Sequence, residues 1–280
     1  MEKGSSKKGS LYVVGTPIGN LKDISLRALE VLEKVDLILC EDTRKTKNLL
    51  THYKIKNSLE SYYKDIEQKK NAKIIQDLLE GKEIAIVSSA GTPAISDPGS
   101  QLVAAAVLAG IPVVPIPGPC ALIAALVVSG LDTSSFCFEG FLPKKSMAKE
   151  EKLRVLFEET RTVVLYESPN RIISTLKMMA GIYQDRKIVV VKELTKIFEQ
   201  VLIGSAQELA ELYEIGKLSL KGEFVLLIEG YKEDKQEPSS LKEEVRGVMK
   251  TFNISQKEAI ALIAKKYKIP KKNVYKSTLS

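Results

Sequence analysis

Residues Ser88–Gly99, with the sequence SSAGTPAISDPG, directly follow the apolar run Ile84–Val87 and precede the helical pattern Ser100–Leu108. The loop contains two glycines and two prolines, with three serines, one threonine and one aspartate. Glycine lets the backbone approach a ligand, while proline fixes φ and removes an N–H donor. Open α/β sheets bind ligands at this kind of junction, where a buried strand turns into a helix. We predict a ligand-binding loop here, and an ordinary long turn is the alternative.

Two further loops of the same kind follow apolar strands. GTPIGN, at Gly15–Asn20, follows the predicted strand Leu11–Val14, and PIPGPC, at Pro115–Cys120, ends the predicted strand Val113–Ile116. Such loops present backbone N–H and C=O groups with little side-chain bulk. They suit a small, flat, polar ligand that is held by the main chain.

Strands and helices alternate along the chain, which predicts an α/β fold with a mainly parallel sheet in the first half. The second half repeats this pattern in a different layout, and the pair Ile188–Val191 and Val201–Ile203 is predicted to form two strands. We therefore expect two α/β domains. The expected organisation is a disordered N-terminus at residues 1–10, domains at 11–117 and 118–230, a linker at 231–240 and a helical module at 241–280.

The excess positive charge lies in the last 46 residues. Residues 235–280 hold eleven Lys/Arg and four Asp/Glu, so their net charge of +7 equals that of the whole chain. This segment shows three short helical patterns. The first spans Leu241–Phe252, the second begins after a predicted capping box formed by Ser255 and Glu258, and the third begins at Lys271. Together they give the outline of a helix-turn-helix. A basic module of this kind indicates a polyanionic partner, most simply nucleic acid, and a solubilising tail is the alternative.

The sequence lacks the residues that several common catalytic and binding sites require. His52 is the single histidine, which argues against a Ser-His-Asp triad, and the three cysteines have no metal-binding or disulfide spacing, so we expect no metal. A P-loop, a dinucleotide-binding G-x-G-x-x-G and a G-x-S-x-G motif are absent from the sequence. Glycines and prolines interrupt the apolar stretch Leu102–Val128, so it is not a membrane span. No signal peptide is recognisable, and we expect a cytoplasmic protein.

Six motifs, in this order, resemble those of the ribosomal RNA small subunit methyltransferase I family, a branch of the tetrapyrrole (corrin/porphyrin) methylases. They are LYVVGTPIGNLKDISLRALEVL, EDTR, SSAGTPAISDPG, PGPCALIAAL, YESPNRI and KELTK, between Leu11 and Lys196. The resemblance implies S-adenosylmethionine-dependent 2′-O-methylation of a cytidine ribose at the decoding centre of 16S rRNA. It also implies that the methyl donor lies in the cleft between two α/β domains and that the protein is a homodimer.

The resemblance also implies which residues bind the donor. They belong to the three loops and to two strand ends of the second domain: Pro17, Ile18, Gly91, Thr92, Pro93, Ile95, Cys120, Ala121, Tyr166, Glu167, Glu223 and Phe224. Thr92 stands where many tetrapyrrole relatives have aspartate, which favours the RNA branch. The segment Ser61–Asp65 departs from the family in lacking the histidine expected there.

The implied reaction is an SN2 transfer, in which the protein chiefly aligns the hydroxyl, the methyl group and the leaving sulfur. A ribose hydroxyl is a poor nucleophile, so a nearby base is expected. The catalytic candidates are the carboxylates that follow apolar strands, namely Glu41, Asp42, Glu167 and Glu193. As an alternative, Glu41 or Asp42 can pair with Arg44, and Glu193 with Lys192 or Lys196.

Basic residues near the expected cleft and in the tail are candidates for phosphate contacts. They are Arg44, Lys144, Lys145, Arg171, Lys192, Lys196, Lys265, Lys266, Lys271 and Lys272. Two other functions remain open at this point. One is a tetrapyrrole methyltransferase, which has no use for the basic tail, and the other is a non-catalytic RNA-binding factor for ribosome assembly, which would not bind S-adenosylmethionine.

Overall fold

The computed structural model describes residues 8–184, 186–216, 219, 221–232, 240–267 and 269–279. The chain forms two compact units, one up to Tyr231 and one from Lys232 onward. Of the expected disordered N-terminus, residues 1–7 lie outside the described residues, but the backbone N–H of Gly9 donates to the Leu78 carbonyl at 2.8 Å, so order begins before the first strand. Of the expected linker, residues 233–239 lie outside the described residues.

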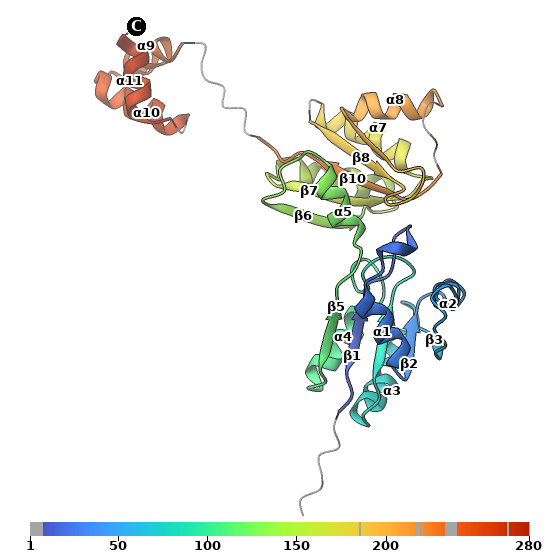
Figure 1. The fold of residues 1–280 in the computed structure, drawn as a ribbon. Helices are drawn as coiled ribbons and strands as arrows, with labels where there is room; N and C mark the ends of the chain where they lie inside the picture. The colour runs from blue at the N-terminus through green and yellow to red at the C-terminus, as the bar shows by residue number, and fades with distance from the viewer. Residues whose placement is uncertain are drawn as a thin grey trace, which may run out of the picture. The chain divides into compact units, whose positions relative to one another are not determined.

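The first sheet is entirely parallel, with the strand order β3-β2-β4-β1-β5 (Figure 1). The central strand β4 is buried at all four positions, because a parallel strand is covered on both faces and so consists of apolar residues. The strands are β1 (Leu11–Val14), β2 (Leu37–Cys40), β3 (Leu59–Ser61), β4 (Ile84–Val87) and β5 (Val113–Ile116).

Helices cover both faces of this sheet. One buried cluster joins α1 and α2 to the sheet, and another joins α3 and α4 to its opposite face. A 3₁₀ turn at Leu21–Asp23, which the sequence patterns did not predict, precedes α1. The helices are α1 (Leu26–Lys34), α2 (Thr43–His52), α3 (Glu67–Leu79) and α4 (Ser100–Leu108).

The second sheet is mixed, with the order β6-β7-β10-β8-β9 and one parallel pairing, between β6 and β7. The helix α5 (Ala121–Val128) packs on one face, whereas α7 and α8 pack on the other (Figure 1). The remaining elements are β6 (Phe136–Phe141), α6 (Ser146–Val155), a 3₁₀ turn (Leu156–Glu158), β7 (Thr162–Glu167), α7 (Ile172–Tyr183), β8 (Ile188–Lys192), β9 (Gln200–Gly204), α8 (Ala206–Glu214) and β10 (Phe224–Ile228).

The C-terminal unit consists of α9 (Leu241–Phe252), α10 (Gln256–Lys266) and α11 (Lys271–Leu279). Its core is formed by Val245 from α9, Val274 from α11 and small and branched residues of α10. The predicted capping box of Ser255 and Glu258 is present at the start of α10. The unit therefore has an apolar core of its own, built from all three helices.

The predicted α/β class, with two sheets and C-terminal helices, is confirmed. Boundaries differ by a residue at element ends: the predicted strand Val201–Ile203 runs from Gln200 to Gly204 as β9. Among the described residues, no helix is long and apolar enough to cross a bilayer. The apolar stretch Leu102–Val128 instead contains most of α4, all of β5 and all of α5.

Candidate active site

The three glycine- and proline-containing loops are fastened to one another by hydrogen bonds. The N–H of Thr16 donates to the carbonyl of Gly91 at 2.9 Å, and the N–H of Gly91 donates back at 3.0 Å. The Thr16 hydroxyl also donates to the Ser88 carbonyl at 3.2 Å. The Thr92 hydroxyl donates to the Pro119 carbonyl at 3.2 Å, which ties in the third loop. The three loops therefore form one structure at the carboxyl ends of β1, β4 and β5.

Two glycines make this convergence possible. A Cβ placed on Gly15 would lie 2.9 Å from the Cα of Gly118, and a Cβ on Gly118 would lie 2.9 Å from the Gly15 carbonyl oxygen. The loop after β4 also adopts positive φ at the non-glycine residues Ala94 (66°) and Ser96 (65°). Such strained backbone is found mostly at functional sites.

A buried carboxylate holds the far end of the loop after β4. Glu67, at the start of α3, is 4% exposed, and its Oε1 accepts the backbone N–H of Gly99 at 2.6 Å. Gly99 has φ of 124°, which favours glycine. The loop is thus fixed both at its start, by Thr16, and at its end, by Glu67.

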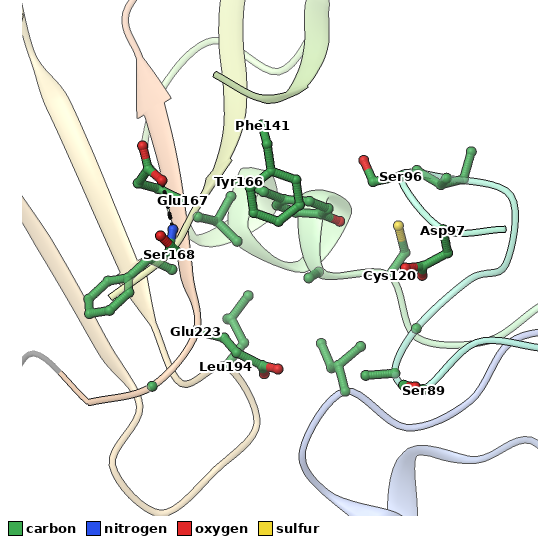
Figure 2. A pocket seen from close by; sticks show the side chains of 18 of the residues that line it. Ser89, Ser96, Asp97, Cys120, Phe141, Tyr166, Glu167, Ser168, Leu194 and Glu223 are labelled. Atoms are coloured by element: carbon green, nitrogen blue, oxygen red, sulfur yellow. Dashed lines mark hydrogen bonds between the residues drawn. The ribbon is translucent and has the colours of Figure 1, made fainter. Parts of the chain in front are cut away.

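A cavity of about 350 Å³ lies between the three loops and the second sheet (Figure 2). Its volume is in the range of small-molecule sites. Of the twelve predicted donor-binding residues, Pro17 lines an adjoining cavity and Pro93 is buried. The other ten line the main cavity: Ile18, Gly91, Thr92, Ile95, Cys120, Ala121, Tyr166, Glu167, Glu223 and Phe224.

Aromatic rings form one wall of the cavity. The ring of Tyr166 packs edge-on against Phe138, with centroids 4.9 Å apart, and lies 5.6 Å from the ring of Phe141. Figure 2 shows the Tyr166 and Phe141 rings together at the side of the cavity. Burial raises the pKa of Tyr166 to about 12, so it remains a neutral phenol at physiological pH. Sequence reasoning did not identify Phe141, which is part of an otherwise ordinary strand.

Glu167 lines the cavity but is held by other protein groups. Its side chain is 0% exposed, and its Oε2 accepts the Thr175 hydroxyl at 2.7 Å. Its Oε1 accepts the N–H of Ser168 at 2.8 Å and lies 3.3 Å from Nε of Arg171. Lys149, also buried, donates to the same Thr175 hydroxyl at 3.0 Å. This network anchors the end of β7, and it leaves Glu167 poorly placed to accept a proton from a ligand.

Glu193 and Glu223 share one lysine. Nζ of Lys196 donates to Oε1 of Glu193 at 2.8 Å and to Oε2 of Glu223 at 2.9 Å. Although burial opposes the shift, the hydrogen bonds from Lys196 and from the backbone of Glu223 lower the pKa of Glu193. Glu193 is therefore an ionised partner of Lys196. Pairing with this lysine was the alternative to a catalytic role in the sequence analysis.

The two carboxylates after β2 differ in their contacts. Asp42 caps α2, its Oδ2 lies 3.2 Å from the guanidinium of Arg44, and hydrogen bonds from the Arg44 side chain and backbone lower the pKa of Asp42. Glu41 instead accepts the Ser89 hydroxyl at 2.9 Å. Both line a second, polar cavity, which shares Ser89 and Lys45 with the first. Glu41 therefore lies where the two cavities meet.

Asp97 is a lining carboxylate that sequence reasoning missed. Burial and the negative charge of Glu41 raise the pKa of Asp97 to about 6, while a hydrogen bond with Ser88 opposes the shift. Of the three carboxylates that line the main cavity, Asp97 is the one that no described lysine or arginine holds, since Glu167 contacts Arg171 and Glu223 contacts Lys196. The sequence signal that could have identified Asp97 is its position in the polar segment SDPG, at the end of the loop after β4.

The candidate phosphate-binding residues fall into two groups. Arg44, with a side chain 89% exposed, and Lys144, Lys145, Lys265, Lys271 and Lys272 lie at the surface. Lys192, in contrast, is 4% exposed because it ends the buried strand β8. Arg171 donates to the carbonyls of Leu142 and Pro143, at 2.8 and 3.0 Å, so its guanidinium is used within the protein. Lys196 and Lys266 are held by glutamates.

Solved structures share this architecture. The chain superposes on uroporphyrin-III C-methyltransferase from Thermus thermophilus in complex with S-adenyl homocysteine, with a TM-score of 0.56 and 18% identity over 79% of this chain and 97% of that one. It also matches a cobalt precorrin-4 methyltransferase of cobalamin biosynthesis, with a TM-score of 0.55 and 19% identity over 78% and 94% of the two chains. At these identities the likeness shows the fold alone.

Sequence comparison is more specific. The model of the Tetrapyrrole (Corrin/Porphyrin) Methylases matches residues 10–210. Proteins named ribosomal RNA small subunit methyltransferase I are similar over almost the whole chain: that of Vibrio cholerae is 44% identical over 95% of this chain and 93% of its own, and that of Escherichia coli O157:H7 is 40% identical over 99% and 97%. The chain therefore belongs to the ribosomal RNA small subunit methyltransferase I family, within the tetrapyrrole (corrin/porphyrin) methylases.

Proposed function

We propose that the protein transfers a methyl group from S-adenosylmethionine to the ribose 2′-hydroxyl of a cytidine at the decoding centre of 16S rRNA. The observation that carries the proposal is the 40–44% identity, over nearly the full length, to relatives named as methyltransferases of small-subunit ribosomal RNA. The lined cavity supports it independently, because ten of the residues expected at a donor site are brought together there.

The residues of the main cavity fit the methyl donor. The rings of Tyr166 and Phe141, tilted by 59° to each other, offer apolar surface for an adenine. The donor supplies a methyl group on an already activated sulfonium sulfur. The protein's task is then to hold the two reactants in line and to take up the proton of the hydroxyl.

Asp97 is the residue that we assign to proton uptake. A carboxylate with a pKa of about 6 is ionised at neutral pH and is more basic than an ordinary aspartate. It faces the cavity from the loop after β4, whereas Glu167 and Glu223 are occupied by protein partners. Glu41, through its hydrogen bond with Ser89, lies on the side of the second cavity, which we assign to the acceptor nucleotide.

A substrate of this kind places the proposed reaction in the cytoplasm, where ribosomal subunits are found in bacteria. The exposed basic residues, Arg44 on α2 and the Lys144–Lys145 turn before α6, supply phosphate contacts near the two sheets.

We also retain the homodimer as a proposal, and sedimentation equilibrium of the purified chain tests it directly.

The deciding experiment uses labelled S-adenosylmethionine and small ribosomal subunits that lack the modification. We expect label in 16S rRNA, with an alkali-resistant dinucleotide that maps the mark to the ribose of one cytidine. A mark on a base would overturn the ribose assignment, and transfer to a porphyrin or corrin without RNA would favour the tetrapyrrole alternative that the fold also suits. Failure to bind S-adenosylmethionine in calorimetry would favour a non-catalytic factor.

The variant Asp97→Asn tests the assigned proton acceptor in the same methyl-transfer assay. Its matched control is Asp65→Asn, because Asp65 is an exposed carboxylate that does not line the main cavity.

A further inference from the structure

The last helix of the C-terminal unit has an unusual charge distribution. α9 and α10 both carry glutamate in the first turn and lysine in the last turn, as the helix dipole favours. α11 begins with Lys271 and Lys272 and has no acidic residue in its first turn. Lys271 and Lys272 therefore do not stabilise their own helix, and a sequence that breaks a local rule in this way does so most often at a functional site.

The same lysines share one face of α11 with an exposed aromatic ring. Val274 is 0% exposed and points into the core of the unit, so the opposite face of the helix is directed to solvent. Lys272 and Lys276, four residues apart, lie on that outer face, and Lys271 and Tyr275, also four residues apart, form the adjoining flank of the helix. All four are exposed, and Tyr275 shows 51% of its surface. Figure 1 shows α11 packed with α9 and α10 in this unit.

These side chains have no protein partners among the described residues, in contrast to their neighbours on α10. Lys266 pairs with Glu244 at 3.0 Å, and its Nζ lies 4.6 Å from the centre of the Tyr267 ring, whose hydroxyl also donates to Glu244. No carboxylate of the described residues forms an ion pair with the α11 lysines. The described residues from 240 onward hold nine Lys/Arg against three Glu, so the surroundings of this face are also positive.

Lysines around an exposed, flat ring are the combination that binds a single nucleic-acid strand. The ammonium groups contact successive phosphates, and an unpaired base stacks on the ring. A duplex offers phosphates but keeps its bases stacked on each other. It would contact the lysines, but the aromatic ring would have no unpaired base on which to stack. Because an aromatic ring stands among the lysines, the face favours a single strand over a duplex.

We propose that the face formed by Lys271, Lys272, Tyr275 and Lys276 binds single-stranded RNA, with the lysines on phosphates and Tyr275 stacked on an unpaired base. The proposal rests on the proposed function in one respect, that RNA is the substrate. It adds a binding site remote in sequence from the methyl-transfer cavity, and it assigns the RNA contact to Tyr275 and Lys276, which the charge pattern alone did not single out.

The test measures binding of the full chain to a fluorescent 12-nucleotide oligouridylate and to a blunt RNA duplex of the same length. Stacking of one base is worth about 1–3 kcal/mol, so Tyr275→Ala should weaken single-strand binding roughly 5- to 150-fold. Tyr275→Phe, which keeps the ring, should restore it, and duplex binding should change little in either variant. Tyr63→Ala, an exposed tyrosine of the first unit, is the control.

The lysines are tested through the salt dependence of the same binding. Lys272→Gln/Lys276→Gln should reduce the slope of log K against log salt by about 1.4, because each phosphate contact on a single strand contributes about 0.7. The double variant Lys250→Gln/Lys257→Gln removes the same charge from exposed positions on α9 and α10 and should change the slope less. Far-UV circular dichroism verifies that every variant is folded.

Three outcomes would overturn the proposal: no loss with Tyr275→Ala, an equal loss for single strand and duplex, or an equal change of slope in the two double variants. Binding of S-adenosylhomocysteine by calorimetry reports on the proposed function separately. A chain that fails to bind the donor but shows the Tyr275 effect would refute the methyl transfer and leave the RNA-binding face in place.

Discussion

Asp97 shows how strongly the surroundings of one side chain determine its chemistry. Three groups face it from different elements: Glu41 after β2, Ser88 after β4 and Tyr166 at the end of β7. If Asp97 takes up the proton, methyl transfer should rise with pH through about 6, where its carboxyl group ionises. Asp97→Asn should lower kcat by about 10²- to 10⁴-fold and remove this rise, as a pH–rate profile would show. A variant that retains both kcat and the acidic limb would assign the proton to another group.

The raised pKa of Asp97 also has a consequence for stability. Since the folded-state pKa, about 6, lies above that of an unfolded aspartate, the folded state binds the proton more tightly, and stability falls as pH rises from about 4 to 6. Asp97→Asn should therefore be more stable than the parent at pH 8, by about 1–2 kcal/mol after allowance for screening of a partly exposed group. The difference should shrink towards pH 4. Urea unfolding at both pH values measures it, and an equal difference at both would contradict the argument.

Thr175 is the central residue of the network below the cavity. Its hydroxyl receives a hydrogen bond from Lys149 and donates one to Glu167, and all three residues are buried. Thr175→Val keeps the shape but leaves two charged groups without this partner, so we expect a loss of about 1–3 kcal/mol in the free energy of unfolding. Ser174→Ala, at an exposed neighbouring position, should cost less than about 0.5 kcal/mol. Urea titration distinguishes the two, and equal losses would show that the network is not stabilising.

At the scale of elements, the loops after β1 and β5 can meet because both have glycine at the contact. A methyl group on Gly15 would lie 2.9 Å from the backbone of Gly118, so Gly15→Ala must push the two loops apart. We expect at least a 10-fold loss of S-adenosylhomocysteine affinity in calorimetry, because the cavity wall is displaced. Gly181→Ala is the control, since nothing lies within 4 Å of a Cβ there and a helical alanine is favoured by up to about 1 kcal/mol. Unchanged affinity in Gly15→Ala would show that the contact is not needed.

The elements themselves were largely readable from local patterns. The buried strand β4, the capping box at Ser255 and the helix α9 are each specified by residues within one short segment. Element ends were less accurate: β9 extends one residue beyond the predicted strand Val201–Ile203 at each end, because its pairing with β8 runs from Gln200 to Gly204, a tertiary contact that no local pattern reveals.

At the scale of the whole molecule, the division into two compact units predicts that they are separable in function. All residues that line the main cavity belong to the unit that ends at Tyr231. Deletion of residues 235–280 should therefore leave binding of S-adenosylhomocysteine within about twofold, while RNA affinity and its salt dependence both fall, since the deleted segment carries a net charge of +7. Calorimetry and fluorescence anisotropy measure the two effects. RNA binding that is unchanged in strength and salt slope would place the RNA contacts in the first unit alone.

The sequence alone determined the order of strands and helices, the three glycine- and proline-containing loops and the family, because apolar runs, glycines and prolines shape the backbone within a few residues of their own position. Only the tertiary structure decided which carboxylates are available. Glu167 is held by the Thr175 hydroxyl and by Arg171, Glu193 pairs with Lys196, and no lysine or arginine of the described residues pairs with Asp97. It also buried Lys192. Charge and pKa depend on the dielectric and on charges a few ångströms away, and those neighbours come from distant parts of the chain.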